Sequence, residues 1–337
     1  MRSRTRQWGS AIAAAAVLVL SAAHGQQSNG TVLGAPGQDD RIPYSQPGES
    51  GLTEPLALIE ARHYPEAAQK IDAYLHSHPD SAAAHFLLGY TYYREDKPRE
   101  SLAEYTSGAR FQNPGANDLA AVAMDYVLLH DYSDADKWLT EATTRSPDIA
   151  LYWYYLGRVK YVENRFDEAI EMFHKCLTVS PRDLRAEYNL GLAYAGAGRI
   201  EEATIAYKTA IAWQQSLGVQ DPQPYLDFGM MLVQQGKPAE ALPLLQRAVA
   251  LGPQNPRAHE ELAQTWKQLH NLPNADAEMQ AAIRLAPEIS ALHFEMGRIF
   301  QLEGLTTKAK DEFARCSALN ATHSTDSAQT PNLPPPD

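Results

Sequence analysis

Two side chains near the middle of the chain could form a metal or redox site. His174 and Cys176 lie two residues apart in the sequence Phe-His-Lys-Cys, and Cys176 is one of only two cysteines. Imidazole nitrogens and thiolates are ligands that zinc binds well. In a helix, however, residues two apart point about 200° away from each other and cannot bind one ion. Whether this chemistry is possible therefore depends on the element that holds the two residues.

Other residues form only fragments of catalytic motifs. The sequence His-Glu-Glu-Leu at His259 begins like a zinc-protease helix, but Ala263 stands where the second histidine would be. His76 and His78 are a weak metal signal, and the glycine-rich stretch at Gly196 lacks the third glycine of a dinucleotide-binding loop. We find no P-loop lysine motif and no nucleophile elbow in the sequence. The sequence therefore predicts no enzyme activity, no cofactor and no bound metal.

The charge balance argues against nucleic acid as a partner. The 337-residue chain has 41 acidic and 29 basic residues, for a formal net charge of −12. No run of lysine or arginine offsets this excess, so nucleic acid and anionic lipid surfaces would be repelled.

The first residues have the three-part plan of a secretory signal peptide. Arg2, Arg4 and Arg6 precede the apolar run 11–20, which is followed by small residues up to Ala23. We predict a signal peptide at residues 1–23, cleaved after Ala23 or Gly25, and hence export to a periplasmic or extracellular location. The apolar run is shorter than the ~20 residues that span a bilayer, so we expect no transmembrane anchor in the mature chain.

Low-complexity segments flank the central part of the chain. Residues 24–50 are rich in Gly, Gln, Ser, Pro and Asp, which predicts a flexible linker. Residues 321–337 end in Thr-Pro-Asn-Leu-Pro-Pro-Pro-Asp, which predicts a disordered Pro-rich tail.

Between these segments, small residues recur every 34 residues with a single step of 38. One series comprises Ala67, Ser101, Ala135, Ala169, Ala203, Ala241, Ala275 and Ala309. A second series in the same register comprises Gly89, Ala123, Gly157, Gly191, Gly229, Ala263 and Gly297. Prolines close several units, at Pro79, Pro147, Pro181, Pro253 and Pro287. A fixed period of this length indicates a repeat architecture.

Each unit has the pattern of two helices joined by a turn. In the fourth unit, Trp153, Leu156 and Gly157 share one stripe of a first helix, and the polar residues 163–165 follow it. A second helix then places apolar residues on one face, at Phe166, Ala169, Ile170, Phe173 and Cys176. No strand-length alternation is sustained anywhere, so the sequence predicts an all-α chain.

A 34-residue helix–turn–helix unit with these small residues and a closing proline resembles the tetratricopeptide repeat (TPR). The resemblance covers residues 48–323 as eight units and implies an α-solenoid, a right-handed superhelix of helix pairs. The first unit departs from the pattern, because Pro55 stands where the others carry Gly or Ala. Its first helix should therefore be short. The four extra residues near 211–224 predict either a second helix that is one turn longer or a longer loop.

The repeat register answers the question about the cysteines. Cys176 and Cys316 occupy the inward position that alanine fills in other units, so His174 points outward. We therefore predict that both are buried, unreactive thiols. The two cysteines are four units apart, too far for a disulfide.

The TPR resemblance implies that positions 2, 5, 9 and 12 of each unit line a concave groove. These positions carry many tyrosines, together with arginine and methionine, as protein-binding surfaces do. The candidate groove residues are Phe86, Tyr90, Tyr93, Tyr154, Arg158, Tyr161, Arg185, Tyr188 and Met230. A competing interpretation is that positions 9 and 12 pack partly against the next unit. Ile42, Pro43 and Tyr44 could occupy the groove until a partner displaces them, and Tyr126 should point inward.

These observations predict an exported scaffold that holds a peptide or partner protein in a Tyr-rich groove, in assembly at the cell envelope or outside the cell. The alternatives are a self-associating structural protein and an accessory domain of a hydrolase or transferase system.

Overall fold

A computed structural model describes residues 42–44 and 48–328 of the chain, with side chains up to residue 321. The predicted signal peptide at 1–23, and residues 24–41 of the predicted linker, lie outside the described residues, as do 45–47 and 329–337. No helix in the described part is long and apolar enough to cross a membrane.

Eight pairs of α-helices follow one another along the described residues, which contain no strand. The first helices of the pairs are α2 (Thr53–Glu60), α4 (Ala82–Arg94), α6 (Ala116–Leu128), α8 (Ala150–Val162), α10 (Leu184–Gly196), α12 (Gln223–Gln234), α14 (Pro256–Gln268) and α16 (Ser290–Leu302). The second helices are α3 (Tyr64–Ser77), α5 (Pro98–Gly108), α7 (Tyr132–Arg145), α9 (Phe166–Val179), α11 (Ile200–Leu217), α13 (Pro238–Leu251), α15 (Leu272–Leu285) and α17 (Thr306–Ala328).

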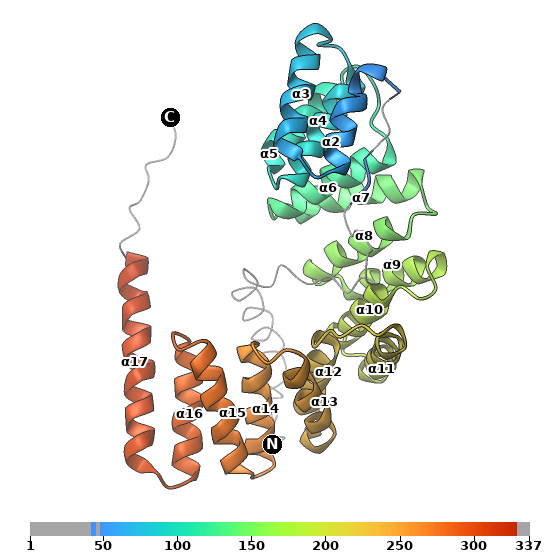
Figure 1. The fold of residues 1–337 in the computed structure, drawn as a ribbon. Helices are drawn as coiled ribbons and strands as arrows, with labels where there is room; N and C mark the ends of the chain where they lie inside the picture. Colours follow the sequence, from blue (N-terminus) through green and yellow to red (C-terminus); the bar gives the residue numbers. More distant parts are fainter. Residues whose placement is uncertain (1–41, 45–47, 329–337) are drawn as a thin grey trace, which may run out of the picture.

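The pairs stack side by side into an open arc (Figure 1). The array descends from α3 to α11 and then turns sideways from α12 to α17. The two helices of each pair pack against each other, and each second helix before α17 packs against the first helix of the next pair, so the core extends along the array. The predicted all-α solenoid is confirmed.

A residue with left-handed backbone joins the two helices of every pair. Positive φ angles of 57° to 79° occur at Arg62, Asp96, His130, Asn164, Gly198, Gly236, His270 and Gly304. These positions repeat with the same period as the small residues, including the one step of 38. The sequence analysis missed this feature because only some of the eight residues are glycine, the residue that adopts this conformation without strain.

Close contact between the two helices of a pair explains the small residues in the first helices. A Cβ atom on Gly157 would lie 2.6 Å from the ring of Phe173. The corresponding pair in the third unit is Ala123 and Leu139, both fully buried. Glycine also faces a ring at Gly89–Tyr105, Gly191–Tyr207 and Gly297–Phe313. A Cβ atom on Gly229 would likewise lie 2.7 Å from Leu245 in the sixth unit, so close helix packing limits this residue whether a ring or a leucine faces it.

The extra residues of the fifth unit lengthen its second helix. Helix α11 has 18 residues, whereas the second helices of the neighbouring units, α9 and α13, have 14. Gly218 ends it with φ of +69°, and Gln214 donates a hydrogen bond to the carbonyl of Asp221 at 2.8 Å. Of the two predicted alternatives, the longer helix is therefore the one observed.

At the two ends of the array, one prediction is confirmed and two are partly wrong. Helix α2 has only eight residues, as Pro55 predicted. The prediction of a flexible linker at 24–50 is wrong for Ile42, which is fully buried, and for Ser50, which begins the 3₁₀-helix Ser50–Leu52. At the other end, α17 continues to Ala328, so residues 321–328 are helical rather than part of a disordered tail. No proline or glycine interrupts this stretch before Pro331.

Candidate partner-binding groove

The nine predicted groove residues all lie on first helices, α4, α8, α10 and α12. They form two groups with different exposure. Phe86, Tyr90, Tyr93, Tyr154 and Arg185 are buried. Tyr161, Tyr188 and Met230 are half-buried, and Arg158 is exposed. Of the nine predicted groove residues, five are therefore closed to solvent and four are at least partly open to it.

Two of the three α4 residues, Tyr90 and Tyr93, are buried for a reason that the repeat pattern does not contain. The ring of Tyr90 lies 5.9 Å from that of Tyr93 and 5.5 Å from that of Tyr44. Residues 42–44 thus cover this end of the groove. Phe86 packs instead against the second helix of its own pair, with its ring 6.1 Å from that of Tyr105.

In the middle of the array, two arginines flank one tyrosine. The guanidinium carbons of Arg185 and Arg158 lie 5.0 Å and 5.9 Å from the centre of the Tyr154 ring. Arg185 also forms a buried ion pair with Asp183 at 2.8 Å, and Asp183 accepts hydrogen bonds from the first backbone amides of α10. Arg185 is therefore committed to the start of its own helix. Of the two arginines, Arg158 is the one placed to reach a partner.

Carboxyl groups that the sequence analysis did not single out lie beside the accessible residues. The Tyr188 hydroxyl donates to Asp227, which also accepts from Gln223 at 3.0 Å. Burial raises the pKa of Asp227 above its usual range and raises that of Glu261 to about 7. These groups occupy position 6 of their units, one residue from the predicted stripe. The middle of the groove therefore combines an exposed cation, half-buried tyrosines and carboxyl groups with raised pKa values.

The two residues of the Phe-His-Lys-Cys stretch point in different directions. Cys176 is fully buried, and burial raises the pKa of its thiol to about 12. His174 shares a hydrogen bond of 2.9 Å with the Tyr194 hydroxyl, away from the cysteine. Cys316 is only half-buried, because α17 is the last helix of the described array and no further unit covers it. The prediction of a buried thiol is therefore wrong for Cys316.

A repeated histidine contact links the two helices of three pairs. His85, His259 and His293 each place Nδ1 within 2.7 Å of a glutamate 19 residues later. Nε2 of each ring lies 3.0–3.2 Å from the carbonyl of a proline six residues earlier. The motif fragment at His259 is thus a structural contact. Within the described residues, no group of three or more His, Cys, Asp or Glu side chains is arranged to hold a metal ion.

Tyr126, predicted to point inward, is half-buried. It lies on α6, and burial raises the pKa of its hydroxyl. The side chain of Tyr126 is therefore less buried than a fully inward position would make it.

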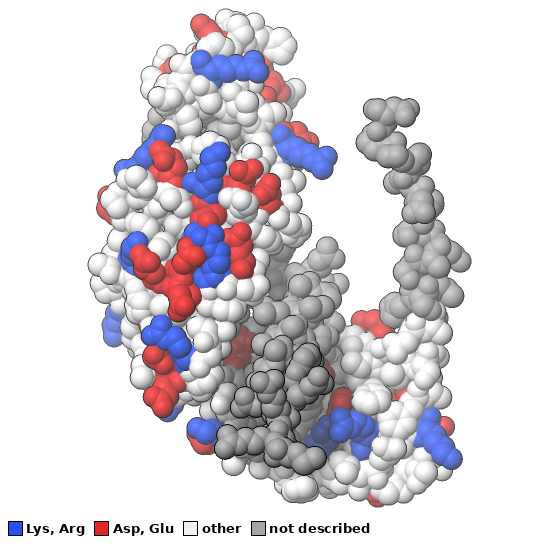
Figure 2. Space-filling model, turned by 180° about the vertical axis from the view of Figure 1, so that it is seen from behind, with Lys and Arg blue, Asp and Glu red and all other residues white. Residues whose placement is uncertain are grey.

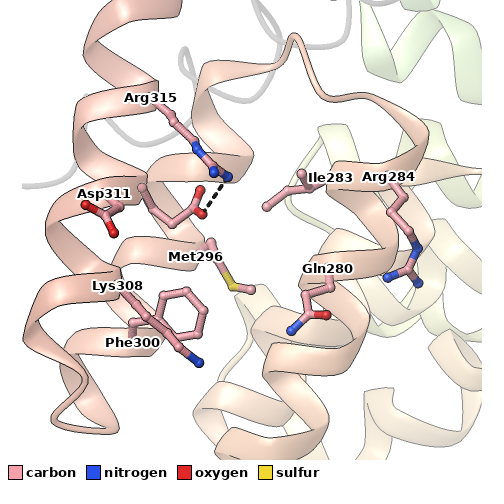
Figure 3. A pocket seen from close by; sticks show the side chains of 9 residues that line it. Gln280, Ile283, Arg284, Met296, Phe300, Lys308, Asp311 and Arg315 are labelled. Carbon is pink, nitrogen blue, oxygen red and sulfur yellow. Dashed lines mark hydrogen bonds and ion pairs between the residues drawn. The ribbon is translucent and has the colours of Figure 1, made fainter.

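A cavity of about 400 Å³ opens between α15, α16 and α17 (Figure 3). Its floor is apolar, with Met296 and Phe300, and its rim carries Arg284, Lys308 and Arg315. Arg315 is paired with Glu312 at 3.0 Å, and Lys308 lies 5.2 Å from the centre of the Phe300 ring. Two of the three basic side chains, Arg315 and Lys308, thus already contact other groups of the chain.

The charged surface is mixed. Figure 2 shows basic and acidic side chains interleaved on the face that it presents. One network joins three helices: Asp136 on α7 accepts from Lys160 and Arg165, each at 2.7 Å. Burial acts to raise the pKa of Asp136, but its contacts with Lys160 and Arg165 outweigh that effect and lower it. Arg165 also pairs with Glu163 at 3.0 Å and with Glu168 at 2.6 Å. Such interleaving provides no extended basic track on that face for a nucleic-acid backbone.

Comparison with known proteins decides the family. Tetratricopeptide repeat profiles match residues 54–117, 123–175, 182–254 and 232–315. The chain belongs to the tetratricopeptide repeat family. The matched residues run from α2 into α17 with short gaps, so the profiles cover most of the described helices.

Curated TPR relatives are much longer than the stretch they share with this chain. The anaphase-promoting complex subunit 3 of Schizosaccharomyces pombe is 23% identical over 176 residues, 52% of this chain and 26% of that protein. The peroxisomal targeting signal receptor of Candida albicans is 31% identical over 96 residues, 28% of this chain and 16% of the receptor. The cellulose synthase 2 operon protein C of Komagataeibacter xylinus is 28% identical over 98 residues, 29% of this chain and 8% of that protein.

Two solved TPR structures share the fold. PilW, a type IV pilus biogenesis factor, aligns with a TM-score of 0.54 at 24% identity, covering 60% of this chain and 92% of PilW. A chain of the Cut9–Hcn1 hetero-tetramer aligns with a TM-score of 0.54 at 14% identity, covering 76% of this chain and 50% of that one.

Proposed function

We propose that this TPR chain is an exported, non-enzymatic scaffold that binds a segment of a partner protein along the middle of its concave groove. The observation that carries the proposal is the strip formed by Arg158, Tyr161, Tyr188 and Met230 on three consecutive first helices, α8, α10 and α12. Tyrosine, arginine and methionine are enriched at protein interfaces, because each offers apolar area with a polar or adaptable end.

The names of relatives support binding to proteins. The matched relatives include a subunit of a multiprotein complex and a receptor for a targeting signal. The relative named for a cellulose synthase operon supports a role at the cell envelope. The N-terminal pattern of arginines followed by an apolar run supports export.

Site-specific crosslinking tests the groove. A photoreactive phenylalanine analogue placed at Arg158, in the strip, should crosslink a discrete partner protein in cells that make the full chain. The matched control places the analogue at Glu171, an exposed position on the second helix of the same unit. Equal crosslinking from both positions, or none from Arg158, would contradict partner binding in the groove.

Export is tested separately by fractionation. A C-terminally tagged full chain should leave the cytoplasm and lose its first 23 to 25 residues, as measured by N-terminal sequencing. A chain that stays in the cytoplasm with an intact N-terminus would refute export and leave the groove proposal standing.

A further inference from the structure

A short segment of the chain lies in the groove like a bound peptide. Residues 42–44 precede the first helix, and their side chains alternate in exposure. Ile42 is fully buried, Pro43 is exposed and Tyr44 is half-buried. Alternation of this kind is expected when an extended strand lies against a surface.

The groove contacts the backbone of this segment as well as its side chains. Tyr93 forms a hydrogen bond with the backbone of Ile42. Asn117, at the start of α6, donates through Nδ2 to the carbonyl oxygen of Tyr44 at 3.3 Å. The Tyr152 hydroxyl donates to Asn117 Oδ1, which orients the amide toward the segment. Backbone hydrogen bonds combined with pockets for alternate side chains are how extended peptides are recognised.

Aromatic and acidic groups hold the side chain of Tyr44. Its ring meets the ring of Tyr90 edge-on, at 5.5 Å between centres. Its hydroxyl donates to Glu60 at 2.9 Å. Arg94 donates to the Tyr90 hydroxyl at 2.6 Å, and its guanidinium lies 5.0 Å from the Tyr64 ring. Contacts from outside the segment thus hold the receptor ring, and such preorganisation lowers the entropic cost of binding.

The contact residues belong to the repeat, whereas the ligand does not. Tyr90, Tyr93 and Asn117 occupy positions 9 and 12 of the second unit and position 2 of the third, all on the predicted concave stripe. Residues 42–44 lie before the first unit. The same surface can therefore accept another segment with the same spacing of side chains.

We propose that the N-terminal end of the groove is a binding site for an extended segment of a partner protein with an aliphatic residue and a tyrosine two positions later. The chain's own Ile42–Tyr44 occupies this site and competes with the partner. The inference deepens the proposed function and rests on it. A ligand tethered by a short linker has an effective concentration of the order of millimolar, so a partner must bind well to displace it.

A labelled peptide tests the site. The probe is a fluorescein-labelled synthetic peptide of residues 38–47, and binding to the full chain is followed by fluorescence anisotropy. The variant Ile42→Ala/Tyr44→Ala empties the site and should bind the probe at least tenfold more tightly than the wild-type chain. The control Pro43→Ala, at the exposed position of the segment, should bind it as weakly as wild type does.

Two further variants test the role of Tyr90 and control for unfolding of the double variant. Adding Tyr90→Ala to the emptied variant should weaken probe binding at least tenfold again. If the double variant loses its helical circular dichroism, Tyr44→Ala alone serves in its place and should bind the probe at least threefold more tightly than wild type. An emptied, folded variant that binds the probe no better than wild type would overturn the inference.

Two other measurements distinguish this inference from self-association and from the proposed function in the middle of the groove. A wild-type dimer that becomes monomeric in Ile42→Ala/Tyr44→Ala, measured by sedimentation, would mean that the segment binds a second copy, and would overturn competition within one chain. Crosslinking from position 158 without any peptide binding would overturn this inference alone. Loss of crosslinking at 158 with the peptide result intact would overturn only the proposed function in the middle of the groove.

Discussion

The second and fourth units both present aromatic residues at groove positions 5 and 12 and differ at position 9, and residues 42–44 cover only the second unit. The second unit carries Phe86, Tyr90 and Tyr93, and the fourth carries Tyr154, Arg158 and Tyr161. Tyr93 is 8% exposed and Tyr90 3% exposed. Tyr161 is half-buried, and Arg158 is exposed. At position 12, the place within the repeat therefore sets the direction of the side chain, while the segment from outside the repeat decides whether solvent reaches it.

The two regions also differ in the layer behind the groove. Asp125 and Ser101 in the third and second units correspond to the apolar pair Val159 and Ala135 one unit later. Asp125 is fully buried, and Ser101 Oγ lies 2.5 Å from its Oδ2 and 2.9 Å from the carbonyl oxygen of Gly89. Since the serine has one proton to donate, a protonated Asp125 lets both contacts be hydrogen bonds. The layer behind the covered end of the groove thus contains a polar contact whose carboxyl group, that of Asp125, titrates.

The largest expected contrast comes from removing the two tyrosines at position 12. Tyr93→Ala should lower the free energy of unfolding by about 3 kcal/mol, because it leaves a cavity under the covering segment. Tyr161→Ala should cost about 1 kcal/mol in stability and weaken partner binding by about 2 kcal/mol. Urea denaturation and binding to the crosslinked partner measure the two effects. Equal stability losses would show that Tyr161 is core and that the middle of the groove is closed.

A smaller effect should appear in the pH dependence. Burial raises the pKa of Asp125 from 3.8 to about 8. The folded state therefore keeps a proton that the unfolded chain releases above pH 3.8. The protonated carboxyl of Asp125 therefore contributes fully to the free energy of unfolding below pH 3.8. This contribution is lost as the pH rises toward 8.

Replacing both partners, Asp125→Val with Ser101→Ala, recreates the pair of the next unit and removes this titration. The double variant should exceed the wild type in free energy of unfolding by about 2 kcal/mol at pH 8, and the difference should shrink toward pH 4. The measurement is the midpoint of urea unfolding across this pH range. The matched control is Val159→Leu with Ala135→Gly, which should shift stability equally at both ends of the range. A difference that is constant between pH 4 and pH 8 would show that Asp125 does not titrate there.

The smallest effect concerns the close contact of the two helices in one pair. Gly157→Ala should lower the free energy of unfolding by about 1 kcal/mol, because the added methyl group must displace the ring of Phe173. Combining it with Phe173→Leu copies Ala123 and Leu139 of the third unit. The double variant should recover about 1 kcal/mol relative to the sum of the single changes. Strictly additive losses would mean that the ring and the glycine do not limit each other.

The sequence by itself determined the period, the number of units and the inward direction of Cys176, since each follows from helical spacing repeated every 34 residues. Only the tertiary structure decided that Ile42 is buried and that Cys316 is half-buried. Both depend on whether another part of the chain lies over the residue. Periodicity specifies a direction on a helix, whereas burial also requires a neighbour, and that neighbour can come from anywhere along the chain.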